Sequence, residues 1–266
     1  MLRNIWLKTL RDQRRPLIWY GIGLMALCLY LFAVYPTIRD NPDLNRTLQN
    51  LPDGVKALIG GTQLDLISPA GYLQAETFAL FIPLLFLIYA IVLGANAIAG
   101  EEERRTLDLL LSYPVARGRV VREKFAALCL LLCALGLILW LALLVGATVI
   151  NMQISGGHLA AATTSAVLLG LWFGALALAL GCATGKRGVA VGVSAAVAVA
   201  GYLMQSLPSF ISSLRPIAKV SPFYLYASSE PLRYGLNLAH VVALLAVTLV
   251  LFVVALVAFR RRDLAV

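Results

Sequence analysis

Charged side chains are scarce in this sequence, and hydrophobic ones are abundant. Asp, Glu, Lys and Arg make up 13% of the 266 residues, whereas 61% are hydrophobic. Soluble domains usually have about 25% charged and about 45–50% apolar residues. A chain with so few charges cannot bury all its apolar side chains in a water-surrounded core, which excludes an ordinary soluble protein. We expect most of the chain to lie in a lipid bilayer.

Catalytic and nucleotide-binding motifs are also missing. The two histidines, His158 and His240, belong to no metal-spacing motif, and no G-x-S-x-G nucleophile motif occurs. The string most similar to a phosphate-binding P-loop, GCATGKR at 181–187, is one residue too short and has Arg187 in place of Ser or Thr. We therefore expect no catalytic, cofactor-binding or metal-binding residues in this chain.

The sequence does contain a series of long apolar segments. A helix needs about 20 apolar residues to cross a bilayer, and six segments satisfy this requirement. None of them contains Asp, Glu, Lys or Arg, although ion-coupled transporters usually keep such groups at mid-membrane depth. The pattern predicts an all-α polytopic membrane protein whose spans, within a membrane domain of residues 17–266, are 17–36, 77–99, 125–150, 159–184, 188–207 and 238–259.

The basic residues indicate how these spans are oriented. If the N-terminus is cytoplasmic, sixteen of the 22 Lys and Arg residues flank the spans on the cytoplasmic side. Because positive residues concentrate in cytoplasmic loops, we expect both termini in the cytoplasm and a multi-pass protein of the inner (plasma) membrane. The net charge of +9 then reflects membrane orientation, so we expect no nucleic-acid partner.

Residues 1–16 have the pattern of a helix that lies in the membrane interface. Apolar side chains, including Trp6, fall on one helical face and basic side chains on the other. We expect Pro16 to turn the chain into the first span. The alternative is a basic flank without helical order.

Two longer polar segments are expected on the outer side. Residues 37–76 are rich in turn-forming residues, which predicts small helices rather than a folded domain. Residues 208–236 contain four prolines, which deny this segment one continuous helix. We expect broken helices at the outer interface.

Glycine patterns mark the fourth and fifth spans, which only the short string GKRG separates. So short a connection predicts an antiparallel pair. Gly170-x-x-x-Gly174 and Gly188-x-x-x-Gly192 would let backbones approach closely. We interpret both patterns as packing inside the chain rather than as a contact between subunits.

The densest charge lies in residues 100–124, GEEERRTLDLLLSYPVARGRVVREK, with six basic and five acidic residues. Its leucines share one helical face while charged side chains point away. Pro114 ends that helix, because the residue before a proline is disfavoured in α conformation. The pattern predicts a short amphipathic cytoplasmic helix that offers charge to a partner. The alternative is a solvated basic loop that only sets the topology.

This segment resembles the stretch between the second and third spans in permease subunits of type-2 ABC exporters. Their pattern is an acidic start followed by G-T-L-x-x-L-L-x-x-P-x-x-R-x-x-x-x-x-x-K. Arg105 stands where these permeases usually have Gly. Two further strings, SPFYL at 221–225 and AFRRRDLAV at the C-terminus, resemble the same family. The matching residues of the charged segment are Glu102, Thr106, Leu107, Leu110, Leu111, Pro114, Arg117 and Lys124.

The resemblance implies a non-catalytic, six-span half-transporter that pairs with a second permease copy or a close homologue. A separate ABC ATPase subunit, which binds ATP and magnesium, would dock below each half. Its closure would rock the spans between inward and outward access. Residues 101–113 would form the coupling helix in a groove of the ATPase, flanked by the connecting helix of residues 1–15. The implied docking residues are Glu101, Glu102, Arg105, Thr106, Leu107, Leu110, Leu111, Pro114 and Arg117, and those of the connecting helix are Arg3, Trp6, Lys8 and Arg11.

We interpret the chain as the permease half of an exporter, and two other functions stay open on the sequence. An ion-coupled secondary transporter would work without any ATPase. A membrane assembly factor would transmit force without moving a substrate. The resemblance is compatible with amphipathic drugs, lipids, peptides or a cofactor-assembly cargo as the transported substrate.

Overall fold

The structure, a computed structural model, describes residues 5–39, 50, 68–106, 116–206, 219, 221–228 and 230–262. Every regular element among these residues is helical. The elements are α1 (Ile5–Arg39), α4 (Pro69–Leu73), the π-helix η1 (Gln74–Phe78), α5 (Phe81–Ala97), α6 (Ala99–Glu103), α8 (Arg117–Val149), α9 (Gly156–Thr184), α10 (Arg187–Ser206), α12 (Pro222–Ala227), α13 (Pro231–Tyr234) and α14 (Leu238–Arg261).

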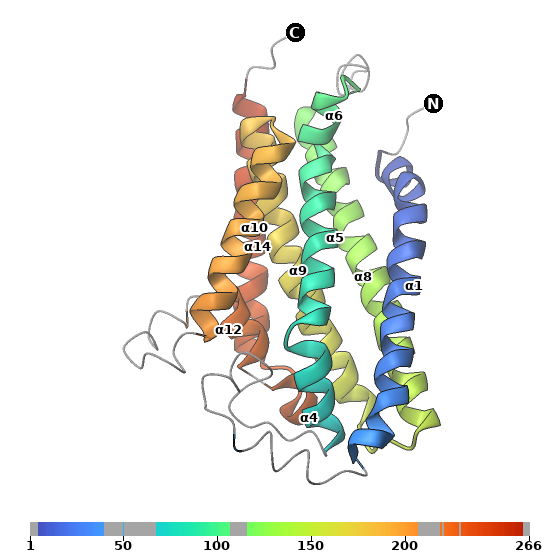
Figure 1. The fold of residues 1–266 in the computed structure, drawn as a ribbon. Coiled ribbons are helices and arrows are strands. Elements are labelled where there is room, and N and C mark those ends of the chain that lie inside the picture. The colour runs from blue at the N-terminus through green and yellow to red at the C-terminus, as the bar shows by residue number, and fades with distance from the viewer. Residues whose placement is uncertain are drawn as a thin grey trace.

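The long helices stand side by side in one bundle (Figure 1). In the described part of the chain, six helical stretches are long and apolar enough to cross a membrane. One of them joins α4, η1 and α5, and the others are α1, α8, α9, α10 and α14. The predicted all-α, six-span fold is therefore confirmed. The start of α1 and the end of α14 lie at the same end of the bundle, which we call the terminal end; we call the opposite end the far end (Figure 1).

The helix at the N-terminus continues into the first span. Residues from Ile5 onward are helical, and α1 runs uninterrupted from Ile5 through Pro16 to Arg39, so the N-terminal segment and the first span form one element; the corner at Pro16 stays a prediction. A proline inside a helix removes one backbone hydrogen bond to the residue four positions earlier. Both Pro16 and that residue, Asp12, lie on the exposed side of α1, where the freed carbonyl is accessible.

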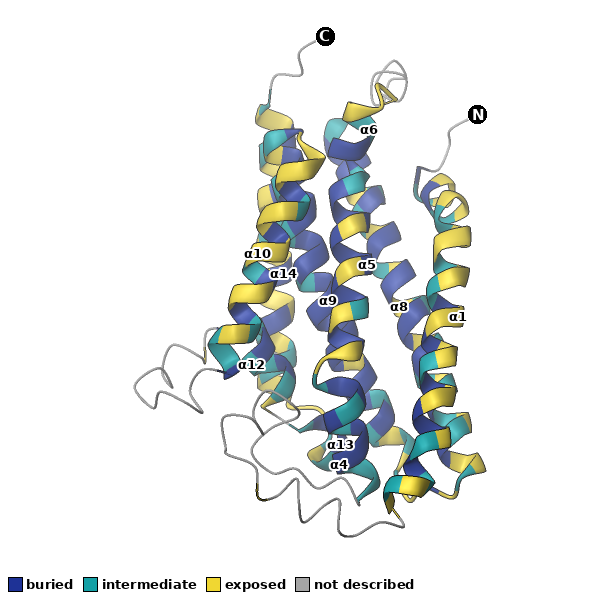
Figure 2. Cartoon of the chain, viewed as in Figure 1, coloured by how far each residue is buried: buried dark blue, intermediate teal, exposed yellow. Residues whose placement is uncertain are grey.

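The core of the bundle is built around α9. This helix contacts α5, α8, α10 and α14, and it is the most buried of the six spans. Figure 2 shows the buried residues concentrated on α5, α8 and α9, while α1 and α10 carry long exposed stripes. The exposed residues along these outer helices are largely apolar, as a lipid environment requires.

Glycine permits the closest approach in this core, between α5 and α9. A Cβ atom at Gly94 would lie 2.2 Å from the carbonyl oxygen of Gly174, so any larger residue would push the helices apart. Gly170 likewise packs against α5 and α8. Gly188 and Gly192 of α10 face open space instead. The expected internal packing therefore holds for the first glycine pattern, although against other helices than α10, and is wrong for the second.

Short helices close the far end of the bundle. Both α12 and α13 begin with a proline, whose missing N–H is not needed in the first helical turn. The hydroxyl of Tyr226 in α12 donates to the carbonyl of Phe78 in η1 (2.7 Å), and the hydroxyl of Ser221 donates to the carbonyl of Gly201 in α10 (2.8 Å). These bonds fix α12 against the second and fifth spans.

Candidate functional site

Five of the nine predicted docking residues belong to the described part of the chain. These are Glu101, Glu102, Arg105, Thr106 and Arg117, and they lie at the terminal end, in or beside α6 and at the start of α8. The described residues of the predicted connecting helix belong to α1 and are Trp6, Lys8 and Arg11. The other predicted residues lie outside the described residues; they are Arg3, Leu107, Leu110, Leu111 and Pro114.

The end of α6 is a tight reversal of the backbone at Arg105, whose φ is 55°. The N–H of Arg105 donates to the carbonyl of Glu102 (2.9 Å), and the N–H of Thr106 donates to the carbonyl of Glu101 (2.9 Å). Where this pair of bonds ends a helix, the residue in the left-handed position is usually glycine. The geometry explains why the family pattern has Gly where this chain has Arg105. A single helix over 101–113 is therefore a wrong prediction, because the chain reverses at Arg105.

Three consecutive glutamates of α6 each bind a different membrane helix. We call the stretch between α6 and α8, residues 104–116, the predicted docking segment. Because α6 directly precedes it, these contacts join the start of this segment to three membrane helices. The pairs are Glu101 with the side chain of Lys124 in α8, Glu102 with the side chain of Arg262 at the end of α14, and Glu103 with the backbone N–H of Arg187 at the start of α10.

The contact between Glu101 and Lys124 is buried. The side chain of Lys124 is 5% exposed and that of Glu101 is 14% exposed, and the Lys124 ammonium donates to Oε1 of Glu101. A buried lysine retains its charge only when an anion compensates for the lost hydration. Lys124 is also the last residue that matches the family pattern, and the fold brings it to Glu101, directly before the first matching residue, Glu102.

The contact between Glu102 and Arg262 joins α6 to the end of α14. The guanidinium of Arg262 donates to the two carboxylate oxygens of Glu102, at 2.5 and 3.0 Å, in the paired geometry that makes such bonds strong. From the start of α8, the guanidinium of Arg117 donates to the backbone carbonyl of Arg262 (2.8 Å). Gly185, which ends α9 with a φ of 66°, leaves room for the Arg262 guanidinium, because a Cβ there would lie 2.0 Å from it.

The N-terminus of α1 is capped by a side chain from another helix. Oε2 of Glu123 in α8 accepts hydrogen bonds from the N–H groups of Ile5 (2.6 Å) and Trp6 (3.3 Å). Its other oxygen accepts from Arg119 (2.7 Å). A carboxylate at this position compensates both the unpaired N–H groups and the positive end of the helix dipole. The predicted connecting helix is thereby attached to α8 at Glu123, six residues after α8 begins at Arg117.

A polar cavity of about 230 Å³ is lined by residues of α1, α5, α6 and α8 at the terminal end. Its lining includes Lys8 and Asp12 of α1, together with Glu101 and Lys124. Oε2 of Glu101 has no hydrogen-bond partner in the described structure. A cavity of this size and polarity can hold several water molecules, which would hydrate that oxygen. Among the described residues, no three His, Cys, Asp or Glu side chains are grouped so that they could hold a metal ion.

Sequence reasoning missed the intramolecular partners at this site. Glu123 and Arg262 looked like ordinary members of charged flanks, and Glu103 was read only as part of an acidic helix start. Their positions are distant in sequence from the residues that they bind, by up to 160 positions for Glu102 and Arg262. The available signal was a run of acidic residues opposite basic residues at the ends of several spans.

Comparison with known proteins identifies the family. The family model described as "ABC-2 family transporter protein" matches residues 3–264. This chain belongs to the ABC-2 transporter family. The match extends over all six membrane helices, and it agrees with the resemblance seen in the charged segment.

Curated relatives of this ABC-2 protein include two permeases and one protein without an assigned role. The "Probable ABC transporter permease protein NosY" of Pseudomonas aeruginosa is 36% identical over 128 residues, which cover 47% of this chain and 46% of that protein. The protein of the same name from Stutzerimonas stutzeri is 40% identical over 78 residues, covering 29% and 25%. "Uncharacterized protein YhcI" of Bacillus subtilis is 23% identical over 319 residues, covering 100% of this chain and 99% of that protein. The ABC-2 chain is accordingly a multi-pass membrane protein and a transporter permease.

Proposed function

We propose that this chain is the membrane-spanning half of an ABC exporter. It pairs with a second copy or a close homologue, and separate ATPase subunits, which bind ATP and magnesium, dock on the segment between α6 and α8. The observation that carries this proposal is the set of contacts made by Glu101, Glu102 and Glu103. They connect the root of the docking segment to three different spans, which is what a segment that transmits force needs.

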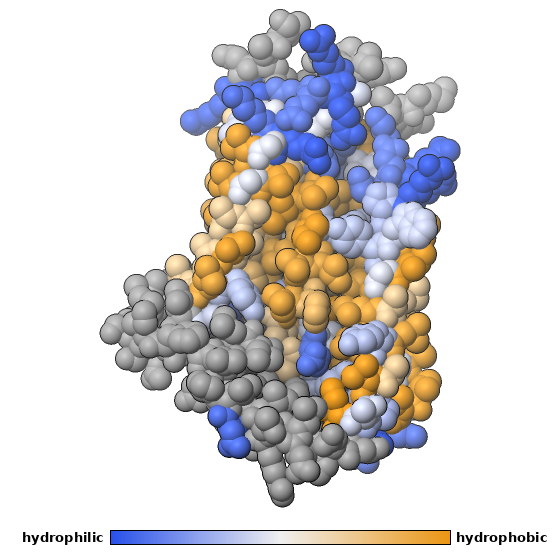
Figure 3. Space-filling view, in the orientation of Figure 1, coloured by the Kyte–Doolittle hydropathy of each residue, from blue (hydrophilic) through white to orange (hydrophobic). Residues whose placement is uncertain are grey.

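The distribution of polar side chains supports the orientation that we propose, with both termini in the cytoplasm of an inner (plasma) membrane protein. Figure 3 shows hydrophilic residues gathered at the terminal end, above a broad hydrophobic band. Basic side chains at that end include Arg117, Arg187 and Arg262. A concentration of Lys and Arg beside the spans is typical of the cytoplasmic side.

The contacts also divide the predicted docking residues by role. Glu101 and Glu102 bind side chains of their own chain, so we assign them to attachment rather than to contact with the ATPase. Arg105 and Thr106 are exposed beside the reversal and are available to a partner. The leucines at 107, 110 and 111 follow at once and would supply the apolar contact that anchors a docking helix.

The force path that follows from this division is short. When the ATPases close, they displace the docking segment together with α6. Glu101 then pulls on α8, Glu102 on α14 and Glu103 on α10, while Glu123 carries the displacement of α8 to α1. Charged hydrogen bonds of good geometry suit this task because they resist changes in direction as well as in distance.

Purification of the tagged chain in mild detergent, followed by mass spectrometry and an ATPase assay, tests the proposal. We expect a P-loop ATPase in a near one-to-one ratio, and we expect Leu110→Asp to lose it. Leu236→Asp is the matched control, because Leu236 is an exposed leucine at the far end of the bundle. Recovery of no ATPase with the unmodified chain would contradict the motor-driven function. Reconstituted vesicles that hydrolyse ATP without moving any substrate would instead indicate the assembly factor.

A further inference from the structure

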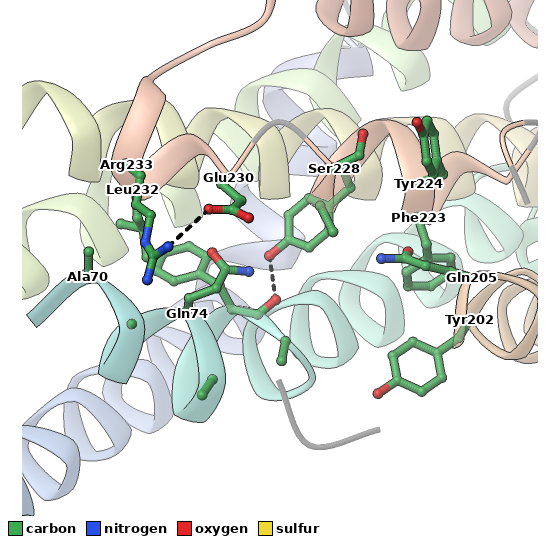
Figure 4. A pocket seen from close by; sticks show the side chains of 16 residues that line it. Ala70, Gln74, Tyr202, Gln205, Phe223, Tyr224, Ser228, Glu230, Leu232 and Arg233 are labelled. Carbon is green, nitrogen blue, oxygen red and sulfur yellow. Dashed lines mark hydrogen bonds and ion pairs between the residues drawn. The ribbon is translucent and has the colours of Figure 1, made fainter. Parts of the chain in front are cut away.

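A second site of interest lies at the far end of the bundle, away from the docking segment. It is a pocket of about 300 Å³ between η1, the end of α10, α12 and α13 (Figure 4). This volume lies at the lower limit of typical small-molecule sites. All of its lining comes from residues that the predicted docking function does not use.

One side of the pocket is polar and has an unused hydrogen-bond acceptor. Oε1 of Gln74 is buried and has no hydrogen-bond partner in the described structure. A buried acceptor without a donor is costly, unless a ligand or water supplies the missing hydrogen. Figure 4 shows Gln74 near Glu230 and Arg233, whose side chains pair at 3.5 Å. That distance is longer than a good hydrogen bond, so the carboxylate can accept from another donor.

The opposite side of the pocket is aromatic. Figure 4 places Tyr202, Gln205 and Phe223 together on this side. The rings of Tyr202 and Phe223 lie 5.7 Å apart in an edge-to-face arrangement, and Phe223 also contacts Phe173 of the core. Such a wall is rigid, and it suits a planar apolar body.

The backbone at Glu230 supports a ligand-binding role for this pocket. Glu230 has a φ of 41°, in the left-handed region that side-chain-bearing residues rarely adopt. Its carbonyl accepts the N–H groups of Arg233 (2.8 Å) and Tyr234 (3.0 Å), which hold the residue in place at the start of α13. Strained residues of this kind concentrate at ligand-binding and active sites.

We propose that this pocket binds an amphipathic molecule with a primary amine at one end and an aromatic body. The ammonium donates to Oε1 of Gln74 and lies near the carboxylate of Glu230. The body lies against Tyr202 and Phe223, whose ring faces also favour a positive charge. An anionic head fits less well, because the site offers an unpaired acceptor, and Arg233, the one cation among the described lining residues, already faces Glu230. The site is a property of this chain and does not depend on an ATPase.

The test measures binding of dansylcadaverine, a naphthalene fluorophore with a primary amine, to the full chain in lipid nanodiscs. Its N-trimethylated analogue has the same body and charge but no N–H on the cationic nitrogen. We expect saturable binding of the amine, with an affinity at least about tenfold higher than that of the analogue, since a hydrogen bond to a charged group has about this effect. Gln74→Leu should lower the affinity for the amine by a similar factor, and Gln74→Glu should raise that affinity. Gln13→Leu at the terminal end is the control for a change of Gln to Leu, and empty nanodiscs correct for partition into lipid.

Two results would overturn this proposal. One is equal affinity of the amine and its trimethylated analogue for the unmodified chain, or no saturable binding of either. The other is unchanged amine affinity in Gln74→Leu. If Gln74→Leu fails to fold, the comparison of the two probes and the Gln74→Glu variant still decide the question. None of these results bears on whether an ATPase copurifies, so the two proposals fail independently.

Discussion

Glu102 and Arg262 are 160 positions apart in the sequence, yet two hydrogen bonds of 2.5 and 3.0 Å join their side chains. The first residue lies at the root of the docking segment and the second at the end of the last span. Because Arg117 also binds the backbone of Arg262, this one residue contacts both α6 and the start of α8. A displacement of α6 would therefore act on α14, as well as on the helices that Glu101 and Glu103 contact.

Reversing one charge of this pair should loosen the terminal end without unfolding the bundle. We expect Glu102→Arg and Arg262→Glu each to raise amide hydrogen exchange several-fold in α6, at the start of α8 and in the last turn of α14, since those amides would open locally. The double variant restores an opposite-charge pair and should return exchange to nearly the original rate. Hydrogen–deuterium exchange with mass spectrometry measures this cycle. Additive effects in the double variant would show that the two side chains do not act on each other.

The buried pair of Lys124 and Glu101 predicts a larger cost. Lys124→Met leaves a carboxylate buried without its partner, which should lower the free energy of unfolding by about 3 kcal/mol. Adding Glu101→Gln removes the orphaned charge and should recover most of that loss. Lys8→Met is the control, because Lys8 lines the same cavity but is exposed. Unfolding in detergent with increasing denaturant gives the comparison; a similar loss from both lysines would contradict a special role for Lys124.

Arg105 offers a change that should stabilise the protein. Its φ of 55° places a side-chain-bearing residue in the left-handed position that the reversal after α6 requires. Arg105→Gly should relieve about 1 kcal/mol of backbone strain, because glycine has no Cβ to collide with the carbonyl. Arg104→Gly, at a φ of −84°, should give no such gain. Thermal unfolding of the two variants distinguishes them, and equal effects would mean that the reversal is not strained.

The sequence predicted the spans well because lipid imposes a strong and simple requirement. Long runs without Asp, Glu, Lys or Arg can only be helices across a bilayer, and all six appear. The corner at Pro16 stays a prediction, because the structure shows only that α1 is helical on both sides of this proline. The helix over 101–113 was wrong because α6 ends at Glu103 and Arg105 takes a left-handed conformation. The family pattern carried a signal for this end, since it has Gly at the position of Arg105, but the arginine itself gave none.

The candidate site was predictable in place but not in its partners. The charged segment indicated where a partner would bind, because it concentrates charge beside a leucine face between two uncharged spans. The sequence could not assign Glu101 to α8 or Glu103 to α10, since those pairings depend on how the helix ends meet in space. The far-end pocket gave no sequence signal, because Gln74 and Tyr202 are common residues that become a site only when η1 and α10 converge.

The glycines of the core provide a matched pair of substitutions. Gly94→Ala would place a Cβ 2.2 Å from the backbone oxygen of Gly174, and a backbone atom cannot move aside without separating α5 from α9. We expect a loss of about 1–3 kcal/mol in the free energy of unfolding, as for other overpacked cores. Gly192→Ala adds the same methyl group to a helix where nothing lies within 4 Å, so the isolated chain should be unchanged or slightly more stable. Unfolding of both variants in detergent tests this contrast. Cross-linking of two copies then tests where the glycines of α10 pack. If Gly192→Ala leaves the single chain intact but reduces its association with a second copy, these glycines pack between subunits, which would explain why they contact nothing inside the chain.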